Sequence, residues 1–503
     1  MKLGLILLFL LSVKFCNNTN YILPFHTKQI YYNESLIKQD YLSKIYSSKI
    51  YTNFIIGSNK EEIKAIINMS QVGFFIYDNA YDYNSSSSFN QEFKSKYFYK
   101  RNYEEGYISN DSLCLIPYKE KQDINNLPIN NCNNFGNVKF SLLKSKQKDI
   151  DINIYENYGI IGLQQCDSQD EYIMPLFIKS LKNTDMINSH TFSFNFINNT
   201  KSGENEGYIL LGDEEFDEDK GFLRRTPSQP IHGQIFWKLV FSTVIIGCSD
   251  TLENNNLKNL DIKYAEIIGD LPYIIGVKEY KNYINSYFFQ DLVSKDVCTF
   301  KNILIDEDYS TYVCNSKSEL FIEKYNNSFP KLYFQHYDLN KTFILEKYDL
   351  FCYNNINKSD PNIYFLVIFP NKNEPYRSPE FPGGTVIPRW KFGIPFLKKY
   401  KLIFNSDNHV ISYYEKFNND NNRINDNDNK QNLNDNKLKW IYIIIIAFLL
   451  VIFFVLGILF HKNIIKLPRK KKANELEDDY EYTINPNTLD EKKASLNNYE
   501  VSN

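Results

Sequence analysis

Residues 192–212 read FSFNFINNTKSGENEGYILLG. Two short apolar runs flank a polar segment of turn-forming residues, which is typical of two β-strands and a connection. The same pattern recurs from about residue 45 to residue 416, for example at 108–115, 138–142, 236–246, 364–369 and 400–405. Long helical periodicity is rare, and one short helix is expected at Met174–Leu181, with Pro175 in its first turn. This region therefore predicts an all-β fold.

The chain begins with a targeting segment. Lys2 is followed by a short apolar run over residues 3–13, which is typical of a secretory signal peptide. We expect a signal peptide at 1–19 and a short prosegment-like region at 20–44. An uncleaved membrane anchor is the alternative, but the run is short for spanning a bilayer.

A second apolar segment covers residues 440–460 and contains no charge. Its 21 residues match a bilayer core of about 30 Å at about 1.5 Å per residue. Lysine and arginine residues follow it between 462 and 472, which predicts a cytosolic tail. We expect a transmembrane helix at 438–461, a cytoplasmic tail at 462–503 and a type I topology. A buried core helix is the alternative, although few core helices are so uniformly apolar.

The composition fits a lumenal or extracellular region. Residues 417–437 are almost wholly polar and predict a disordered stalk. The net charge of −3 argues against a nucleic-acid partner. Of the eight cysteines, Cys16 lies in or beside the signal peptide. The other seven form no CxxC pair, which suggests disulfides, with one cysteine left over, and no structural zinc. Glycosylation sequons begin at Asn33, Asn68, Asn84, Asn110, Asn198, Asn326, Asn340 and Asn357. We expect a glycoprotein in the secretory pathway or at the cell surface, with no metal and no cofactor.

Seven segments, in order, resemble motifs of the pepsin-like aspartic proteases, including the membrane-anchored plasmepsins and memapsins. They are Ile50–Gly57, Gly106–Leu115, Tyr158–Leu163, Phe192–Phe196, Gly207–Gly212, Phe236–Leu239 and Phe392–Asn405. The resemblance implies two β-rich lobes, at 45–230 and 231–416, on either side of a peptide-binding cleft. The predicted fold class is therefore an all-β, bilobal pepsin-like fold with a single C-terminal transmembrane helix.

The catalytic chemistry of that family needs two aspartates that share a proton. The family's first aspartate motif matches AIINMSQVGFFI at residues 65–76, where Asn68 takes the aspartate position. The second matches AEIIGDLPYIIG at residues 265–276, where the position is Ile268. Neither side chain can act as a general base. Asp270 is the one candidate substitute, but a solvated loop carboxylate is the simpler interpretation, and no catalytic residue is expected.

The resemblance also implies features around a cleft. Tyr99 stands seven residues before Gly106, the spacing of the family's flap tyrosine, although the chain has 39 tyrosines. The family's second-lobe disulfide corresponds to Cys314 and Cys352. Two further pairings, Cys248 with Cys298 and Cys114 with Cys132, are also considered.

Three functions remain open from the sequence. The first is a membrane-anchored pseudoprotease that binds a peptide or protein partner through the cleft or the lobe surfaces. The second is an active membrane-bound aspartic endopeptidase whose catalytic residues are substituted or displaced. The third is a surface protein of unrelated all-β fold. No Asp-Thr-Gly or Asp-Ser-Gly triplet occurs in the chain, which favours the first.

Overall fold

The computed structural model describes the β-rich part of the chain. The described residues are 20–29, 41–99, 102–118, 135–144, 159–164, 175–197, 205–212, 222–228, 236–247, 258–260, 263–303, 306–354, 359–371 and 389–415. They belong to a compact unit that extends to Phe417. The expected signal peptide, stalk, transmembrane segment and cytoplasmic tail lie outside the described residues.

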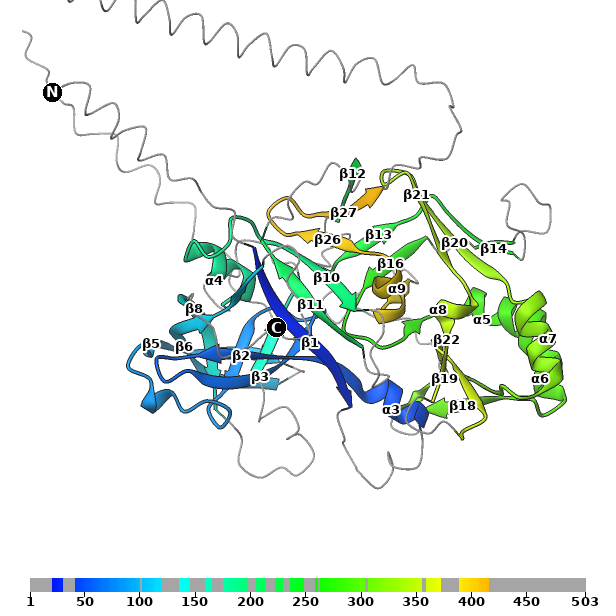
Figure 1. Ribbon diagram of the computed structural model, residues 1–503, viewed down its shortest axis with the longest axis horizontal. Helices are drawn as coiled ribbons and strands as arrows, with labels where there is room; N and C mark the ends of the chain where they lie inside the picture. Colours follow the sequence, from blue (N-terminus) through cyan, green and yellow to red (C-terminus); the bar gives the residue numbers. More distant parts are fainter. Residues whose placement is uncertain are drawn as a thin grey trace, which may run out of the picture. The chain divides into compact units, whose positions relative to one another are not determined.

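The largest sheet has 14 strands within the described ranges. They are β1 (Tyr21–Gln29), β2 (Ser48–Ile56), β3 (Glu61–Asn68), β4 (Phe74–Tyr77), β5 (Asn90–Tyr99), β6 (Asn102–Cys114), β7 (Ile116–Pro117), β8 (Phe135–Leu143), β9 (Gly159–Gly162), β10 (Thr191–Ile197), β11 (Glu206–Leu211), β12 (Phe222–Pro227), β26 (Leu402–Asn405) and β27 (Val410–Glu415). Strand β1 pairs with both β11 and β2, so residues expected to form a prosegment-like region lie within this sheet. Figure 1 shows β1 beside β11 and β2.

Two further sheets come from the second half of the chain. The nine-stranded sheet contains β13 (Lys238–Val240), β16 (Tyr264–Ile267), β17 (Ile274–Ile275), β18 (Cys298–Ile303), β19 (Asp306–Asn315), β22 (Phe351–Tyr353), β23 (Asn362–Phe365), β24 (Val367–Pro370) and β25 (Trp390–Phe392). The four-stranded sheet contains β14 (Thr243–Gly247), β15 (Lys258–Leu260), β20 (Lys331–His336) and β21 (Lys341–Leu345). The apolar run at 236–246 thus forms two strands of different sheets, rather than one.

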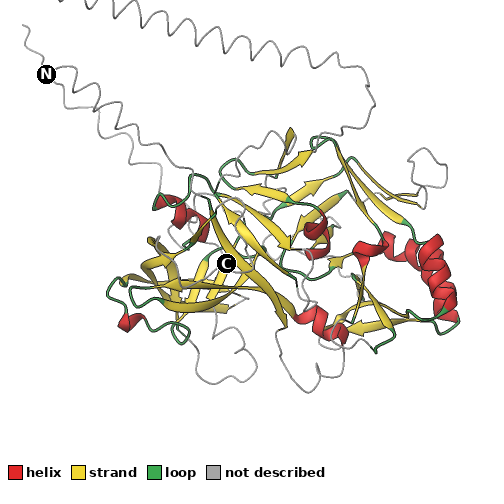
Figure 2. Cartoon of the chain, viewed as in Figure 1, coloured by secondary structure: helices red, strands yellow, loops and turns green. Residues whose placement is uncertain are grey.

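Short helices lie between the strands (Figure 2). They are α3 (Tyr41–Ser47), η1 (Tyr83–Ser85), α4 (Phe177–Asn183), α5 (Lys278–Ile284), η6 (Asn285–Phe289), α6 (Gln290–Ser294), α7 (Glu319–Asn327), α8 (Lys347–Leu350) and α9 (Ile394–Lys399). The expected helix at Met174–Leu181 corresponds to α4. The segments α5, η6 and α6 follow one another without a break, and the sequence did not predict them. An ion pair between Asp291 Oδ2 and Lys324 Nζ, 3.0 Å apart, joins α6 to α7.

The predicted fold class, an all-β, bilobal pepsin-like fold with one C-terminal transmembrane helix, is wrong. Strands predominate, but helices interrupt them repeatedly. The chain up to Phe417 forms one compact unit instead of two lobes. The physical reason is that β26, from the end of this unit, pairs with β10 in the first sheet, and one apolar core continues from Tyr21 to Ile411. In the part of the chain that the structure describes, no helix is long and apolar enough to cross a membrane.

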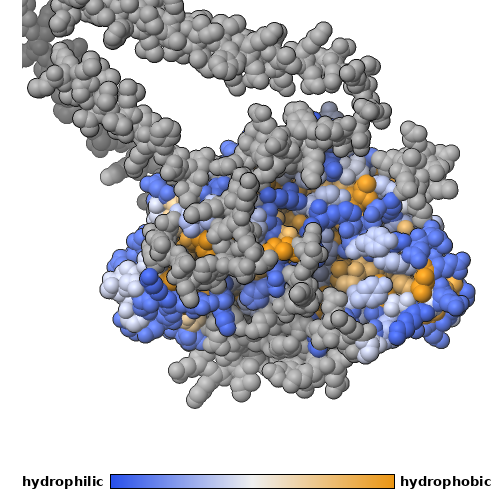
Figure 3. Space-filling model, in the orientation of Figure 1, coloured by the Kyte–Doolittle hydropathy of each residue, from blue (hydrophilic) through white to orange (hydrophobic). Residues whose placement is uncertain are grey.

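The surface carries few large apolar side chains. On the face shown in Figure 3, hydrophilic residues surround smaller hydrophobic areas. The exposed large hydrophobic residues of the described part are Val240, Tyr287, Val293, Phe300, Ile322, Tyr337, Tyr348 and Tyr353. Tyr337 is the most exposed of these, at 85%.

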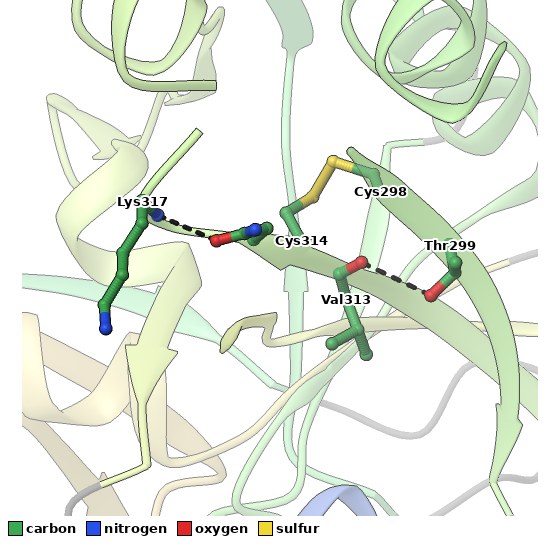
Figure 4. Close-up of a disulfide and its surroundings, with 6 residues drawn as sticks. Cys298, Thr299, Val313, Cys314 and Lys317 are labelled. Carbon is green, nitrogen blue, oxygen red and sulfur yellow. Dashed lines mark hydrogen bonds between the residues drawn. A yellow bond between two sulfur atoms is a disulfide. The ribbon is translucent and has the colours of Figure 1, made fainter. Parts of the chain in front are cut away.

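The predicted disulfide between Cys314 and Cys352 is also wrong, because Cys314 is bonded to Cys298 (Figure 4). These two residues are directly opposite each other in the β18–β19 pair. Cys352 is a free cysteine on β22, and β23 lies between β22 and β19. Two strand spacings amount to about 10 Å, beyond the about 7 Å that a disulfide spans between Cα atoms.

The considered pairing of Cys248 with Cys298 is excluded by the same bond. Cys114 is disulfide-bonded. Cys132, its expected partner, lies outside the described residues, so that pairing stays a prediction.

Replacing Cys298 and Cys314 together by serine should lower the free energy of unfolding by about 3 kcal/mol. The bond closes a loop with a sequence separation of 16 residues, and a cross-link of about that length restricts the unfolded chain by this amount. Chemical unfolding of the full-length chain, monitored by tryptophan fluorescence, would measure the loss. Cys352→Ser is the matched control and should change stability by less than half as much. An equal loss in the control would contradict the assigned pairing.

Candidate functional site

The two segments that the resemblance assigns to the catalytic aspartates form loops at the ends of buried strands. The first loop, residues 68–70, begins at the last residue of β3. Asn68 pairs with Gly162 of the parallel strand β9, and the carbonyl of Asn68 accepts a hydrogen bond from the Leu163 N–H at 2.9 Å. These bonds hold the backbone of the first loop against β9.

The second loop, residues 268–271, follows β16. The Ile268 N–H donates to the carbonyl of Phe392 on β25 at 2.8 Å, and the Leu271 N–H donates to the carbonyl of Ile268 at 3.0 Å. The Ile394 N–H in turn donates to the carbonyl of Leu271 at 2.6 Å. The second loop is therefore a tight turn attached to β25 and to the start of α9.

The two loops touch each other, although they are 200 residues apart in the sequence. The Met69 N–H donates to Asp270 Oδ1 at 3.2 Å. The Gly269 N–H points at Met69 Sδ, also at 3.2 Å. Met69 and Asp270 are almost fully buried, at 1% and 2% exposure. The fold therefore brings together the two loops, residues 68–70 and 268–271, that the motif resemblance singled out.

The side chains at the two aspartate positions have no acid–base chemistry. Asn68 Oδ1 accepts hydrogen bonds from Ser70 N and Ser70 Oγ, both at 2.9 Å, which is a local turn of the kind that asparagine often forms. Ile268 is apolar and buried, at 6% exposure. Neither residue can take a proton from water or give one to a leaving group.

Asp270 is the single carboxylate in the two loops. Its Oδ1 accepts the Met69 N–H, and its Oδ2 lies 3.7 Å from Lys49 Nζ at the start of β2. A shared-proton dyad needs a second carboxylate at hydrogen-bond distance, and neither loop supplies one. The contacts of Asp270 make it a link between the loops and β2. Its suggested role as a substitute catalytic residue gains no support from this geometry.

The predicted flap corresponds to the hairpin of β5 and β6. Tyr99 pairs with Asn102 at the far end of this hairpin, and Gly106 pairs with Ser95. Gly106 is packed so closely that an added Cβ would lie 2.6 Å from the carbonyl oxygen of Leu142 on β8. The side chain of Tyr99 lies outside the described part, so its role as a flap tyrosine stays a prediction.

A buried ion pair beside the second loop was not predicted. Glu266 Oε2 lies 2.7 Å from Arg389 Nε, and Glu266 is two residues before Ile268. Lys238 is opposite Glu266 on β13. Burial, with a smaller effect from Arg389, lowers the pKa of Lys238 to about 8. The signal was present in the sequence, because Glu266 is one charge inside the apolar run AEII, where a buried charge usually needs a partner.

Lys49, by contrast, has no such signal, since nothing in the sequence relates the start of β2 to Asp270.

Among the described residues no group of three or more histidine, cysteine, aspartate or glutamate side chains could hold a metal ion. The expectation that the protein uses no metal stays a prediction.

Comparison of the sequence with protein-family models and with curated proteins finds no match. The resemblance to motifs of the pepsin-like proteases stays a prediction from the sequence.

Replacing Asp270 by alanine should lower the free energy of unfolding by about 1–3 kcal/mol, because the buried Met69 N–H would lose its acceptor. Lys49→Ala is the matched variant. The Lys49 side chain is 23% exposed and its ion pair is long, so its loss should cost less than about 1 kcal/mol. Chemical unfolding of the full-length variants would compare the two. A larger loss for Lys49→Ala would show that the ion pair, and not the hydrogen bond, joins the loops.

Proposed function

We propose that this protein binds a peptide or protein partner without cleaving it, as a pseudoprotease would. The observation that carries the proposal is the contact between the two loops. In this contact the Met69 N–H donates a hydrogen bond to Asp270. Asn68 and Ile268 occupy the positions where the resemblance places the aspartates of the protease family.

The chemistry of the loops argues against proteolysis. Peptide hydrolysis by this class of site needs one carboxylate to activate water and a second acid to polarise the scissile carbonyl. The two loops hold one carboxylate, and that carboxylate is occupied by a backbone N–H and lies near a lysine ammonium group. Loss of members of a catalytic set lowers rates by about 10⁴- to 10⁶-fold in well-studied hydrolases.

An edge of the first sheet supports a peptide as the partner. Within the described ranges, β5 ends the order of this sheet and pairs only with β6. An edge strand offers unpaired backbone N–H and C=O groups to which an extended peptide can add as a further strand. The hairpin of β5 and β6 is also the segment that the resemblance assigns to the flap over a bound peptide.

The disulfides support a location in the secretory pathway or at the cell surface, with this unit facing the lumen or the exterior. Cys298 is bonded to Cys314, and Cys114 is disulfide-bonded as well. Such bonds persist in oxidising compartments and are rare in the cytosol.

The proposal is tested by incubating the full-length protein with a peptide library between pH 3 and pH 7 and reading the products by mass spectrometry. We expect no cleavage beyond that given by the Asp270→Asn variant, which keeps the size of the side chain but removes its acid. Cleavage by the wild-type protein that is lost in Asp270→Asn would overturn the proposal in favour of an active endopeptidase.

Binding is tested with the same library, by identifying peptides that the immobilised full-length protein retains. Gly393→Val is the control, because its Cβ would lie 2.2 Å from the Leu271 carbonyl oxygen and displace the second loop. We expect the wild-type protein to retain specific peptides. We expect the Gly393→Val variant to lose them while it still shows the wild-type circular dichroism spectrum. Retention of no peptide by the wild-type protein would count against a peptide ligand.

A further inference from the structure

The hairpin of β20 and β21 ends in an exposed four-residue turn. His336 pairs with Lys341 across the hairpin, and residues 337–340 connect the two strands. The Asn340 N–H donates to the Tyr337 carbonyl at 2.9 Å, which closes a β-turn. Asn340 has φ of 45°, in the left-handed region that asparagine tolerates better than most residues. The turn therefore holds Asn340 in one defined conformation at the tip.

Asn340 also begins the glycosylation sequon Asn340-Lys341-Thr342. Asn340 is exposed, and no hydrogen bond of its side chain is seen among the described residues. Two of the other sequon asparagines form side-chain hydrogen bonds. The Asn110 amide donates to Glu92 Oε1 at 2.9 Å, and Asn326 Oδ1 accepts from Lys347 Nζ at 3.3 Å. Among the described residues, no group therefore accepts a hydrogen bond from the Asn340 amide nitrogen, which lies at a site open to solvent.

Tyr337, three residues before Asn340, is 85% exposed, whereas Leu339 in the same turn is completely buried. The turn therefore buries one apolar side chain and leaves a large aromatic ring in water beside the sequon. The two ends of a β-turn lie within about 7 Å of each other at their Cα atoms. The ring is accordingly within reach of a sugar attached to Asn340, and the apolar C–H face of a pyranose can cover an aromatic face.

We propose that Asn340 carries an N-linked glycan whose first sugar packs on the ring of Tyr337. The donor would be an oligosaccharide linked to a polyprenyl diphosphate. The Asn340 amide nitrogen forms a bond to the anomeric carbon, the bond from that carbon to the diphosphate oxygen breaks, the polyprenyl diphosphate leaves, and the amide gives up one proton. The inference rests on the lumenal location proposed above and not on the absence of proteolysis. A negative result in the glycan assay would therefore leave the result of the cleavage assay unaffected, and the reverse also holds.

The glycan is tested on the full-length chain produced in a eukaryotic secretory pathway. Enzymatic release of N-glycans in ¹⁸O-water converts each modified asparagine to labelled aspartate, and mass spectrometry of peptides locates the label. We expect the label at residue 340, its loss in Thr342→Ala and its retention in Thr342→Ser. The variant Asn110→Gln, which removes another sequon, should leave the label at residue 340 unchanged. An unlabelled residue 340 in the wild-type protein overturns the proposal, whether or not other sequons are labelled.

The contact with Tyr337 has its own readout. Glycan removal from the wild-type protein should lower the thermal unfolding midpoint by about 1–3 °C, because the Tyr337 ring would lose the sugar that covers it. In Tyr337→Ala the same treatment should produce no shift. Tyr353→Ala, which removes another exposed tyrosine, is the matched control and should behave as the wild-type protein does. An equal shift in Tyr337→Ala would overturn the packing of the sugar on this ring.

Discussion

Trp237 joins parts of the chain that are far apart in sequence, and the arrangement of the sheets depends on it. Its indole is completely buried, and its Nε1–H donates to the carbonyl of Leu163 at 2.8 Å, just beyond β9. Its ring packs edge-on against Phe192 of β10 and Phe404 of β26, with centroids 5.8 and 5.1 Å away. A large buried ring with its polar group satisfied contributes strongly to a core, so this contact favours one continuous core.

The two loops of the candidate site depend on the same arrangement. The first loop follows a strand held by β9, and Trp237 is attached just beyond β9. The second loop follows β16. This strand pairs with β13, which begins at the residue after Trp237. The Ile267 N–H donates directly to the Trp237 carbonyl at 2.8 Å. Trp237 thus lies between the supports of both loops, which explains how a contact as short as that between Met69 and Asp270 forms across 201 residues of chain.

The contacts between the two loops of the candidate site serve structure. A buried carboxylate that accepts a backbone N–H is costly to remove. The same loop segments that would hold reactive groups in an enzyme here hold each other.

The sequence by itself determined the predominance of strands, because short apolar runs between turn residues can be recognised locally. It also singled out both loops and showed that Asn68 and Ile268 are not acids, since residue identity alone decides whether a side chain can titrate. Tertiary structure alone decided the pairing of Cys314 with Cys298, because strand register sets which cysteines face each other. It also decided that one core replaces two lobes, and that Lys49 lies beside Asp270. These features depend on contacts between distant segments, which no local pattern of residues specifies.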